Sequence, residues 1–258
     1  RCLESDLELN TDSDRDDSIN EFESFKFTGD TSRIKLSSNN TKLFEDDFTI
    51  SVLVKPEKVQ LNENKEYDEF PILSIPGYNI GLFYNSFRRF FCQTYDVNKK
   101  PYSITTDILG ERWVHLSMVY SDGNVISFYQ NGKLIDSITM DDSILKLSTD
   151  EIFIGCANGK KTNTDFFYGL ISSIEIYDIA LTSDEILEIS ENPIKPKMRN
   201  FNNYKSSEYL YCQIIPSLSN GKTCVDIASN YSANLNNVYI NKDNHSFKSF
   251  LPKPFNRD

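Results

Sequence analysis

Residues that could act as acids, bases or nucleophiles do not fall into a catalytic pattern in this sequence. Glycan hydrolysis uses two carboxyl groups held about 5 Å apart. The nearest candidate string, Glu175-Ile176-Tyr177-Asp178, has the wrong spacing and no second glutamate. Acyl transfer at a G-x-S-x-G turn is not indicated either, because the motif does not occur. We therefore expect no catalytic activity, and we keep glycan hydrolysis as a minor alternative.

Several partner classes are excluded by composition. The chain has five cysteines, none of them in a C-x-x-C pair, and two histidines, so the ligands of a structural zinc site are missing. The net charge of −11 argues against nucleic acid, because phosphate binding depends on clustered Lys and Arg. No run of about 18 apolar residues occurs, so we expect no membrane insertion.

Two kinds of side chain could bind a ligand. Arg88 and Arg89 interrupt an apolar stretch, and arginine is enriched where interfaces bind most tightly. In a hairpin they would point to opposite faces or into the turn, and a solvated turn is the alternative. Aromatic rings could stack on sugars, although most aromatic residues at period two belong to a core. The aromatic candidates are Tyr78, Tyr84, Phe87, Tyr95, Tyr102 and Phe166.

Short strands separated by turn residues must position these side chains. Apolar and polar residues alternate through much of residues 22–177, and β-branched and aromatic residues dominate the apolar positions. Asp122-Gly123 and Asn131-Gly132 favour tight hairpins, which predicts an antiparallel meander. The pattern predicts an all-β fold, a two-sheet antiparallel jelly-roll sandwich, whose core includes Trp113 and Phe128.

Composition divides the chain into three segments. Residues 1–20 are acidic and polar and form a predicted leader, and residues 21–192 form the predicted sandwich. Thr182 and Glu185 have the spacing of a capping box, which predicts one short helix near residues 183–190. Residues 193–258 contain five prolines and are predicted to be a linker followed by a small β appendage.

Four stretches, in this order, resemble the laminin-G-like, concanavalin-A-like lectin superfamily, and in particular its pentraxin-related branch. They are F-K-F-T-G at 25–29, F-T-I-S-V-L-V-K-P at 48–56, W-V-H-L to F-Y-Q-N-G-K-L within 113–134, and I-G, F-Y-G-L-I and L-T-S-D-E-I within 154–186. Leu53 stands where this family usually has tryptophan. The stretches span roughly residues 22–190.

The resemblance implies a fold more firmly than a function. Members bind sugars, proteins, steroids or lipids, and a minority hydrolyse glycans with an E-x-D-x-x-E strand that this sequence lacks. We expect an extracellular recognition or adhesion module, secreted or at a cell surface, that binds a protein receptor or a glycan. Three N-x-[ST] sequons, at Asn39, Asn230 and Asn244, give weak support to secretion. The alternative is a structural spacer within a multidomain ectodomain.

A calcium site is also implied by the resemblance. Local matching to pentraxin-like relatives places its oxygen ligands at Asn79, Asn158 and Asp165. The acidic run expected after Gly155 is replaced by a stretch that contains two lysines, C-A-N-G-K-K. Only one carboxylate therefore remains, and an ordinary loop turn is the alternative. We expect no cofactor other than calcium.

The tail contains two cysteines, Cys212 and Cys224, that flank the tight-turn signal Asn220-Gly221. We predict a hairpin in which these two thiols form a disulfide. Residues 226–238 resemble the opening of another laminin-G-like repeat, so the tail is either the truncated start of a second sandwich or an appendage packed on the first. We further expect Cys92 and Cys156 to face each other across the sandwich. Cys2 then has no predicted partner among the five cysteines.

Overall fold

The structure is a computed structural model of the chain. It describes residues 22–38, 46–57, 69–76, 80–107, 111–146, 151–157, 166–191, 193, 210–216, 219–220, 222–225 and 231–243. The predicted acidic leader lies outside these residues.

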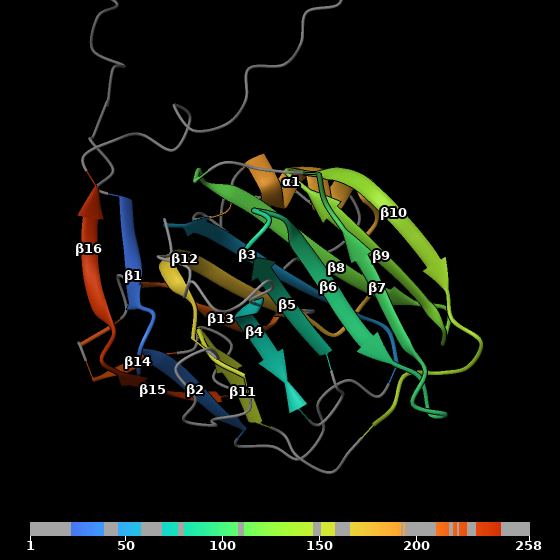
Figure 1. Cartoon of the computed structure of the whole chain (residues 1–258), viewed down its shortest axis with the longest axis horizontal. Coiled ribbons are helices and arrows are strands. Elements are labelled where there is room, and N and C mark those ends of the chain that lie inside the picture. Colours follow the sequence, from blue (N-terminus) through green and yellow to red (C-terminus); the bar gives the residue numbers. More distant parts are fainter. Residues whose placement is uncertain are drawn as a thin grey trace, which may run out of the picture.

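Two antiparallel sheets lie face to face (Figure 1). Sheet A contains β1 (Phe22–Thr28), β3 (Phe48–Pro56), β8 (Val114–Ser121), β9 (Val125–Gln130), β10 (Lys133–Thr139), β12 (Tyr168–Tyr177), β13 (Leu210–Ile214) and β16 (Tyr239–Asp243). Sheet B contains β2 (Arg33–Ser38), β4 (Glu69–Ile75), β5 (Ile80–Asn85), β6 (Phe90–Tyr95), β7 (Pro101–Thr105), β11 (Glu151–Ile154), β14 (Thr223–Val225) and β15 (Tyr231–Asn236). The predicted all-β antiparallel sandwich is confirmed.

The order of strands shows a jelly-roll pattern, with strands distant in sequence lying side by side. Sheet A follows the path β10-β9-β8-β3-β12-β1-β16, and β13 also pairs with β12. Sheet B follows the path β14-β15-β2-β11-β4-β5-β6-β7. Figure 1 shows sheet B in front of sheet A, with α1 (Ser183–Glu191) at the top.

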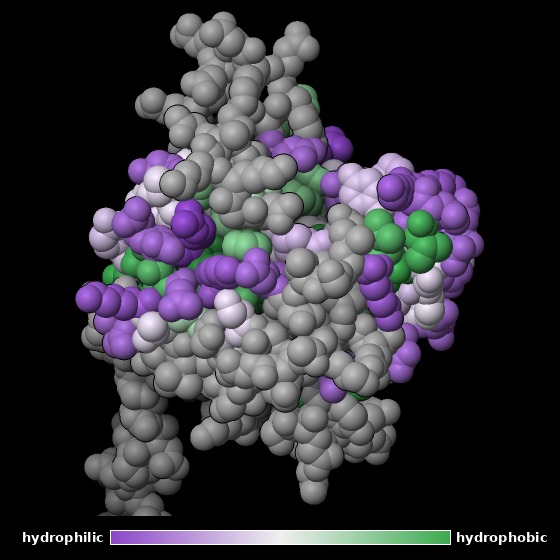
Figure 2. All heavy atoms as spheres, turned by 90° about the horizontal axis from the view of Figure 1, so that it is seen from below, coloured by the Kyte–Doolittle hydropathy of each residue, from purple (hydrophilic) through white to green (hydrophobic). Residues whose placement is uncertain are grey.

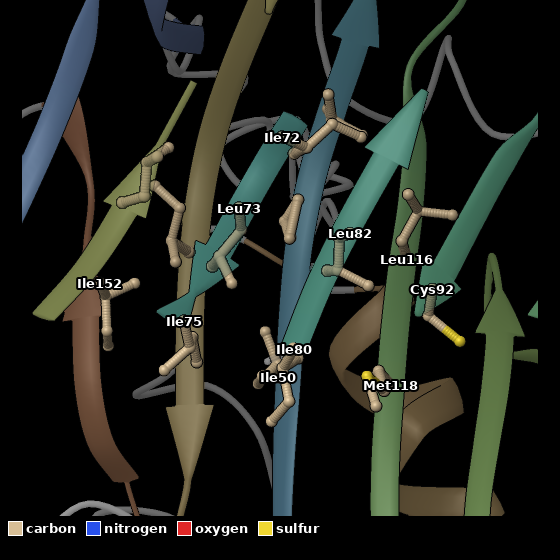
Figure 3. Close-up of a cluster of buried hydrophobic side chains, with 14 of the residues drawn as sticks. Ile50, Ile72, Leu73, Ile75, Ile80, Leu82, Cys92, Leu116, Met118 and Ile152 are labelled. Carbon is tan, nitrogen blue, oxygen red and sulfur yellow. The ribbon is translucent and has the colours of Figure 1, made fainter. Parts of the chain in front are cut away.

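The space between the sheets is filled by side chains at alternate strand positions, as the pleat of a strand requires. Leu116 and Met118 from sheet A lie in the same cluster as Leu82 and Cys92 from sheet B (Figure 3). Trp113 is 3% exposed and Phe128 is fully buried, as the sequence predicts. A single core of this size provides the main stabilisation of the fold.

The local signals in the sequence formed the structures they predict. Asp122, Gly123, Asn131 and Gly132 all have positive φ angles, from 50° to 78°, which suits the tight hairpins that join β8 to β9 and β9 to β10. The helix begins with the predicted capping box. The Thr182 backbone N–H donates to Glu185 Oε2 at 2.7 Å, and the Glu185 N–H donates to Thr182 Oγ1 at 3.4 Å.

The C-terminal strands extend the edges of both sheets. β13 pairs with β12 in sheet A, whereas β14 pairs with β15 in sheet B. β15 also pairs with β2, and β16 pairs with β1. The predicted hairpin between the two cysteine-bearing strands is therefore wrong, because those strands belong to different sheets.

The disulfide-pinned appendage is not supported either, because Cys212 is a buried thiol in the core cluster. The reason lies in β12. Its first half pairs with β1 up to Ile171, so the backbone groups of its second half, from Ile174 to Tyr177, are left for β13. Buried backbone groups must find hydrogen-bond partners, and this requirement prevails over the local turn signal at Asn220-Gly221.

The predicted contact between Cys92 and Cys156 across the sandwich is also wrong. Cys92 lies on β6 and points into the core, while Cys156 follows β11 and packs with Phe153 and Phe166. The two cysteines therefore belong to separate clusters, one on each side of sheet B. Burial raises the pKa of the Cys92 thiol to about 12, so this side chain behaves as a small apolar residue.

Candidate functional site

A shallow groove of about 150 Å³ lies on the outer face of sheet B, the face that points away from the core. It is formed by β4, β5 and β6 together with the residues that follow β4 and β11. Its lining combines aromatic, amide, hydroxyl and small side chains. The residues are Ser74, Pro76, Ile80, Gly81, Phe83, Gln93, Tyr95 and Ala157.

Strand alternation decides which side chains reach the groove. In β5, Leu82 and Tyr84 belong to the core cluster, so Gly81 and Phe83 take the outer face. In β6, Phe90 and Cys92 likewise belong to the core. The outer face of β6 therefore carries Phe91, Gln93 and Tyr95.

The register brings these outer positions side by side. Gly81 lies opposite Gln93, and Phe83 lies opposite Phe91. On the other side of β5, strand β4 places Ser74 opposite Gly81. The groove is thus centred on Gly81, where three adjacent strands contribute no side chain larger than an amide.

Gly81 provides space for an aromatic ring. A Cβ atom at this position would lie 2.1 Å and 2.3 Å from two ring atoms of Phe83. The Phe83 ring therefore lies directly against the Gly81 backbone. It also stacks on the Phe91 ring, with centroids 4.9 Å apart and an interplanar angle of 13°. Phe91 is 5% exposed and supports Phe83, which is half-buried.

The polar side chain next to this ring is Gln93. It is half-buried, and its amide makes no hydrogen bond to another residue in the described part of the chain. A carboxamide can donate and accept hydrogen bonds, as a sugar hydroxyl can. A flat ring beside such a group suits a ligand with one apolar face and a hydroxyl-bearing rim.

Of the predicted ligand-binding residues, Arg88 and Arg89 lie at the tip of the β5–β6 hairpin and are exposed. Asn85 holds this tip, because its side-chain oxygen accepts hydrogen bonds from the N–H groups of Phe87 and Arg89, both at 3.1 Å. Phe87 is 55% exposed. The tip is therefore a fixed turn that presents an aromatic ring and two guanidinium groups.

The other predicted residues have different surroundings. Phe166 is 3% exposed and packs against Phe153 and Cys156, so its ring supports the region beside the groove and has little surface for a ligand. Tyr84 and Tyr102 belong to the core cluster, whereas Tyr95 lines the groove.

The predicted calcium ligands Asn79, Asn158 and Asp165, and the aromatic candidate Tyr78, lie outside the described residues. Within the residues that the structure describes, no group of three or more His, Cys, Asp or Glu side chains could hold a metal ion. Calcium binding at the rim therefore stays a prediction. An increase in melting temperature with millimolar calcium would support it.

Sequence reasoning missed Gly81, Phe83 and Gln93. The signal that could have found them is the alternation of β5 and β6, which puts Phe83 and Gln93 out of step with the core residues Leu82 and Cys92. The pairing of β5 with β6, which brings Gln93 opposite Gly81 and Phe91 opposite Phe83, depends on the tertiary structure.

Glu175, the acidic residue closest to a hydrolase pattern, lies on the outer face of sheet A and is 1% exposed. Its carboxylate accepts hydrogen bonds from Tyr177 Oη at 2.6 Å, Gln213 Nε2 at 3.0 Å and Ser173 Oγ at 3.2 Å. A carboxylate held by three neutral donors is stabilised in place. This arrangement fits a structural role.

A second hollow, of about 380 Å³, is lined by Asp46, Asp47, Asp178 and Glu185 among others. Glu185 caps α1. Burial raises the pKa of Asp47, and the nearby Asp122 and Asp46 add to this shift; burial also raises the pKa of Asp178. Because Glu185 already has a structural role and no ligand-specific feature accompanies the acids, the groove on sheet B is the better candidate site.

No helix in the described ranges is long and apolar enough to cross a membrane. Figure 2 shows the molecule from below the view of Figure 1, and the described surface on this side is mostly hydrophilic, with separate hydrophobic areas. Such scattered apolar side chains are ordinary for a protein surface.

Comparison with solved structures finds the same fold in binding proteins. A putative carbohydrate-binding protein from Bacteroides ovatus matches with a TM-score of 0.63 and 16% identity, over 86% of this chain and 60% of that one. The binding domain of botulinum neurotoxin serotype G matches with a TM-score of 0.55 and 18% identity, over 67% and 43%. A heptameric SAP-like pentraxin from Limulus polyphemus matches with a TM-score of 0.49 and 14% identity, over 67% and 82%.

The matches to the Bacteroides protein and to the neurotoxin domain show a common fold and nothing finer. The chain spans about three fifths of the length of the Bacteroides protein and under half of the length of the neurotoxin domain. A comparison with curated protein sequences finds no match.

The family comparison covers more than half of the chain. The family model described as the concanavalin A-like lectin/glucanases superfamily, a laminin-G-type model, matches residues 28–187. This region contains β2 to β12, including the groove on sheet B, and it extends into α1. The chain therefore belongs to the concanavalin A-like lectin/glucanases superfamily.

Proposed function

We propose that this chain is a non-catalytic carbohydrate-binding module that acts in recognition or adhesion outside the cell. The observation that carries the proposal is the Phe83 ring, which is held flat against Gly81 and stacked on Phe91 beside the Gln93 amide. A match to a putative carbohydrate-binding protein of the same fold supports it.

The binding mode follows from the groove. The apolar face of a sugar ring would stack on Phe83, and its hydroxyl groups would exchange hydrogen bonds with Gln93. A volume of about 150 Å³ is smaller than that of an ordinary small-molecule pocket. We therefore expect contact with one or two sugar units, modest affinity at one site, and stronger attachment where several copies bind together.

The absence of turnover is part of the proposal. Glu175 is buried and accepts three hydrogen bonds, and it lies on the other sheet from the groove. Incubation with a panel of glycans, followed by chromatography of the products, should show no cleavage. Cleavage that disappears in Glu175→Gln would contradict this part of the proposal.

A glycan array, followed by calorimetric titration of the best ligand, tests the proposal. We expect Phe83→Ala to weaken binding about thirtyfold, since truncation of an aromatic anchor costs about 2 kcal/mol or more. Ser103→Ala is the matched control. Ser103 lies on β7 opposite Gln93, on the same outer face of sheet B, but it does not line the groove. Wild-type affinity in a folded Phe83→Ala variant would refute the site.

A protein receptor is the second candidate partner, and the exposed Phe87 at the hairpin tip favours it. The variant Phe87→Ala distinguishes a protein receptor from a glycan as the partner. It should weaken capture of a protein receptor and leave the glycan array signal unchanged, because the Phe87 side chain does not line the groove.

A further inference from the structure

An exposed apolar surface lies where α1 meets the start of β10, at the edge of sheet A (Figure 1). Six large apolar side chains are exposed in the described part of the chain, and three of them lie here. They are Leu134 and Ile135 of β10 and Leu187 of α1, each between 37% and 45% exposed. Single exposed apolar side chains are ordinary, whereas a group of neighbours marks a contact surface. We call these three residues the α1–β10 surface.

The turn between β9 and β10 holds the helix and the strand together. A Cβ atom on Gly132 would lie 2.7 Å from Leu187 Cδ1 and 2.9 Å from Leu187 Cα, so the Leu187 side chain lies directly on this turn. Leu134 follows two residues later and pairs with Tyr129. Tyr129 in turn belongs to the same buried cluster as Ile186 of α1. The apolar side chains of the helix and of the strand are therefore neighbours.

Acidic residues border this surface. The sequence of α1, S-D-E-I-L-E-I-S-E, contains four acidic residues and no basic one. Asp184 and Glu191 of the helix are exposed, and so is Asp136 of β10. Lys133 is the single basic residue of β10. Negative charge therefore exceeds positive charge around the apolar centre, as it does in the whole chain, whose net charge is −11.

The placement of these acids costs the helix stability. Glu191 lies in the last turn of α1, which has no basic residue, and negative charge at this end opposes the helix macrodipole. Asp184 and Glu188 are four residues apart, a spacing at which like charges repel. Residue choices that oppose local stability are expected where they serve a function. A positively charged partner would remove this cost on binding.

The same features decide among the possible occupants. A twofold contact between two copies presents the same surface on both partners, so acids would face acids. An anionic membrane surface is repelled for the same reason. The bulge at Ile135 and the charged Asp136 oppose the addition of a further strand to this edge. A basic partner has the complementary charge.

We propose that the α1–β10 surface binds a basic amphipathic segment of another protein. The apolar side chains of that segment cover Leu134, Ile135 and Leu187, and its Lys or Arg side chains pair with Asp184 and Glu191. The glycan groove lies on the outer face of sheet B, whereas this surface lies at an edge of sheet A. The inference is therefore independent of the proposed glycan binding, and the chain could hold a glycan and a protein partner together.

The experiment uses three fluorescent synthetic peptides of equal length and the full 258-residue chain. The first peptide carries Lys and Leu at helical spacing, the second has Glu in place of each Lys, and the third has Ser in place of each Leu. Fluorescence anisotropy measures the affinity of each peptide at low and at high salt. We expect the Lys–Leu peptide to bind best, and its binding to weaken at high salt.

Leu187→Gln tests the apolar centre. It should weaken binding of the Lys–Leu peptide by about tenfold, because burial of a leucine side chain contributes roughly that factor or more. Glutamine is a good helix former, so the helix should persist. Val97→Gln is the matched control. Val97 is 43% exposed, close to the 44% of Leu187, but it lies between β6 and β7, and its replacement should leave the affinity unchanged.

Glu191→Lys tests the acidic border. It should weaken binding about three- to fivefold, as expected for the loss of one exposed ion pair. The same change should raise the melting temperature by about 1–3 °C, because lysine suits the end of a helix that glutamate opposes. Weaker binding by a more stable protein separates a role in recognition from a role in folding. Glu69→Lys makes the same change of charge at an exposed position of β4 and should keep the affinity.

Three outcomes would overturn the inference. Wild type that does not bind the Lys–Leu peptide, or binds all three peptides equally, would exclude a basic amphipathic partner. Equal losses in Leu187→Gln and Val97→Gln, or in Glu191→Lys and Glu69→Lys, would show attraction to the whole acidic chain and no site. A concentration-dependent dimer in sedimentation that Leu187→Gln abolishes would assign the surface to a second copy. Each of these results would leave the proposed glycan binding standing.

Discussion

Replacement of Gly81 by alanine is expected to remove glycan binding while the protein stays folded. The φ angle of Gly81 is not in the left-handed region, so alanine fits its backbone. The new Cβ would lie 2.1 Å from the Phe83 ring, whereas ordinary contact begins at 3.4 Å. The difference, 3.4 − 2.1, means that the ring must move by at least about 1.3 Å.

The cost to stability should be small. Displacement of Phe83 weakens its stacking on Phe91, which contributes about 0.5–1.5 kcal/mol. Replacing glycine with alanine restricts the unfolded chain and returns about 0.4–1 kcal/mol. The net change should therefore be under about 1 kcal/mol, or a shift in melting temperature of no more than about 4 °C for a domain of this size.

Calorimetric titration of a glycan ligand and differential scanning calorimetry together measure both quantities. We expect Gly81→Ala to bind at least about tenfold more weakly, because the ring no longer lies where the sugar stacks. A double-mutant cycle provides the control. If Gly81→Ala acts through the ring, adding it to Phe83→Ala should change the affinity no further. Wild-type affinity in Gly81→Ala, or an additive loss in the double mutant, would refute the reasoning.

Three further substitutions test the packing. Trp113 is 3% exposed, so Trp113→Ala should lower the free energy of unfolding by about 3–5 kcal/mol; an unchanged denaturation midpoint would place the ring outside the core. Glu175→Ala should cost about 2 kcal/mol or more, because Tyr177 and Gln213 would lose a buried acceptor, and a neutral result in urea would show that water replaces the carboxylate. The Cys92 pKa is raised to about 12 from an ordinary value near 9 in the unfolded chain, so its contribution to stability is complete below pH 9 and is lost as pH rises from 9 toward 12. Wild type should therefore lose more stability than Cys92→Ala between pH 8 and pH 11 in chemical denaturation, and parallel losses would contradict the assignment.

Much of the fold could be predicted because its signals are local. Period-two alternation marks the strands, and the positive-φ pairs Asp122-Gly123 and Asn131-Gly132 fix two hairpins. Thr182 and Glu185 formed the capping box their spacing indicates. Each of these features depends on residues within a few positions of one another, so the sequence carries them without knowledge of the rest of the chain.

The cysteines show where local reasoning ends. A turn signal at Asn220-Gly221 predicted that Cys212 and Cys224 pair. In the fold, β13 satisfies the open edge of β12, while β14 joins β15 in the other sheet. The available edge of a strand about 35 residues earlier in the chain decided the outcome, and no local pattern contains that information.

The candidate site divides in the same way. Composition and residue pattern by themselves indicated an aromatic-rich, acidic, all-β chain. The sequence also singled out Arg88 and Arg89 as candidate binding residues. Only the tertiary structure put Gln93 opposite Gly81 and Phe91 opposite Phe83, because strand register depends on side chains packing over many residues at once. Strand alternation likewise puts Phe83 on the outer face and its neighbours Leu82 and Tyr84 in the core. Adjacent residues in a sequence are equivalent until a pleat and a turn assign them to different faces.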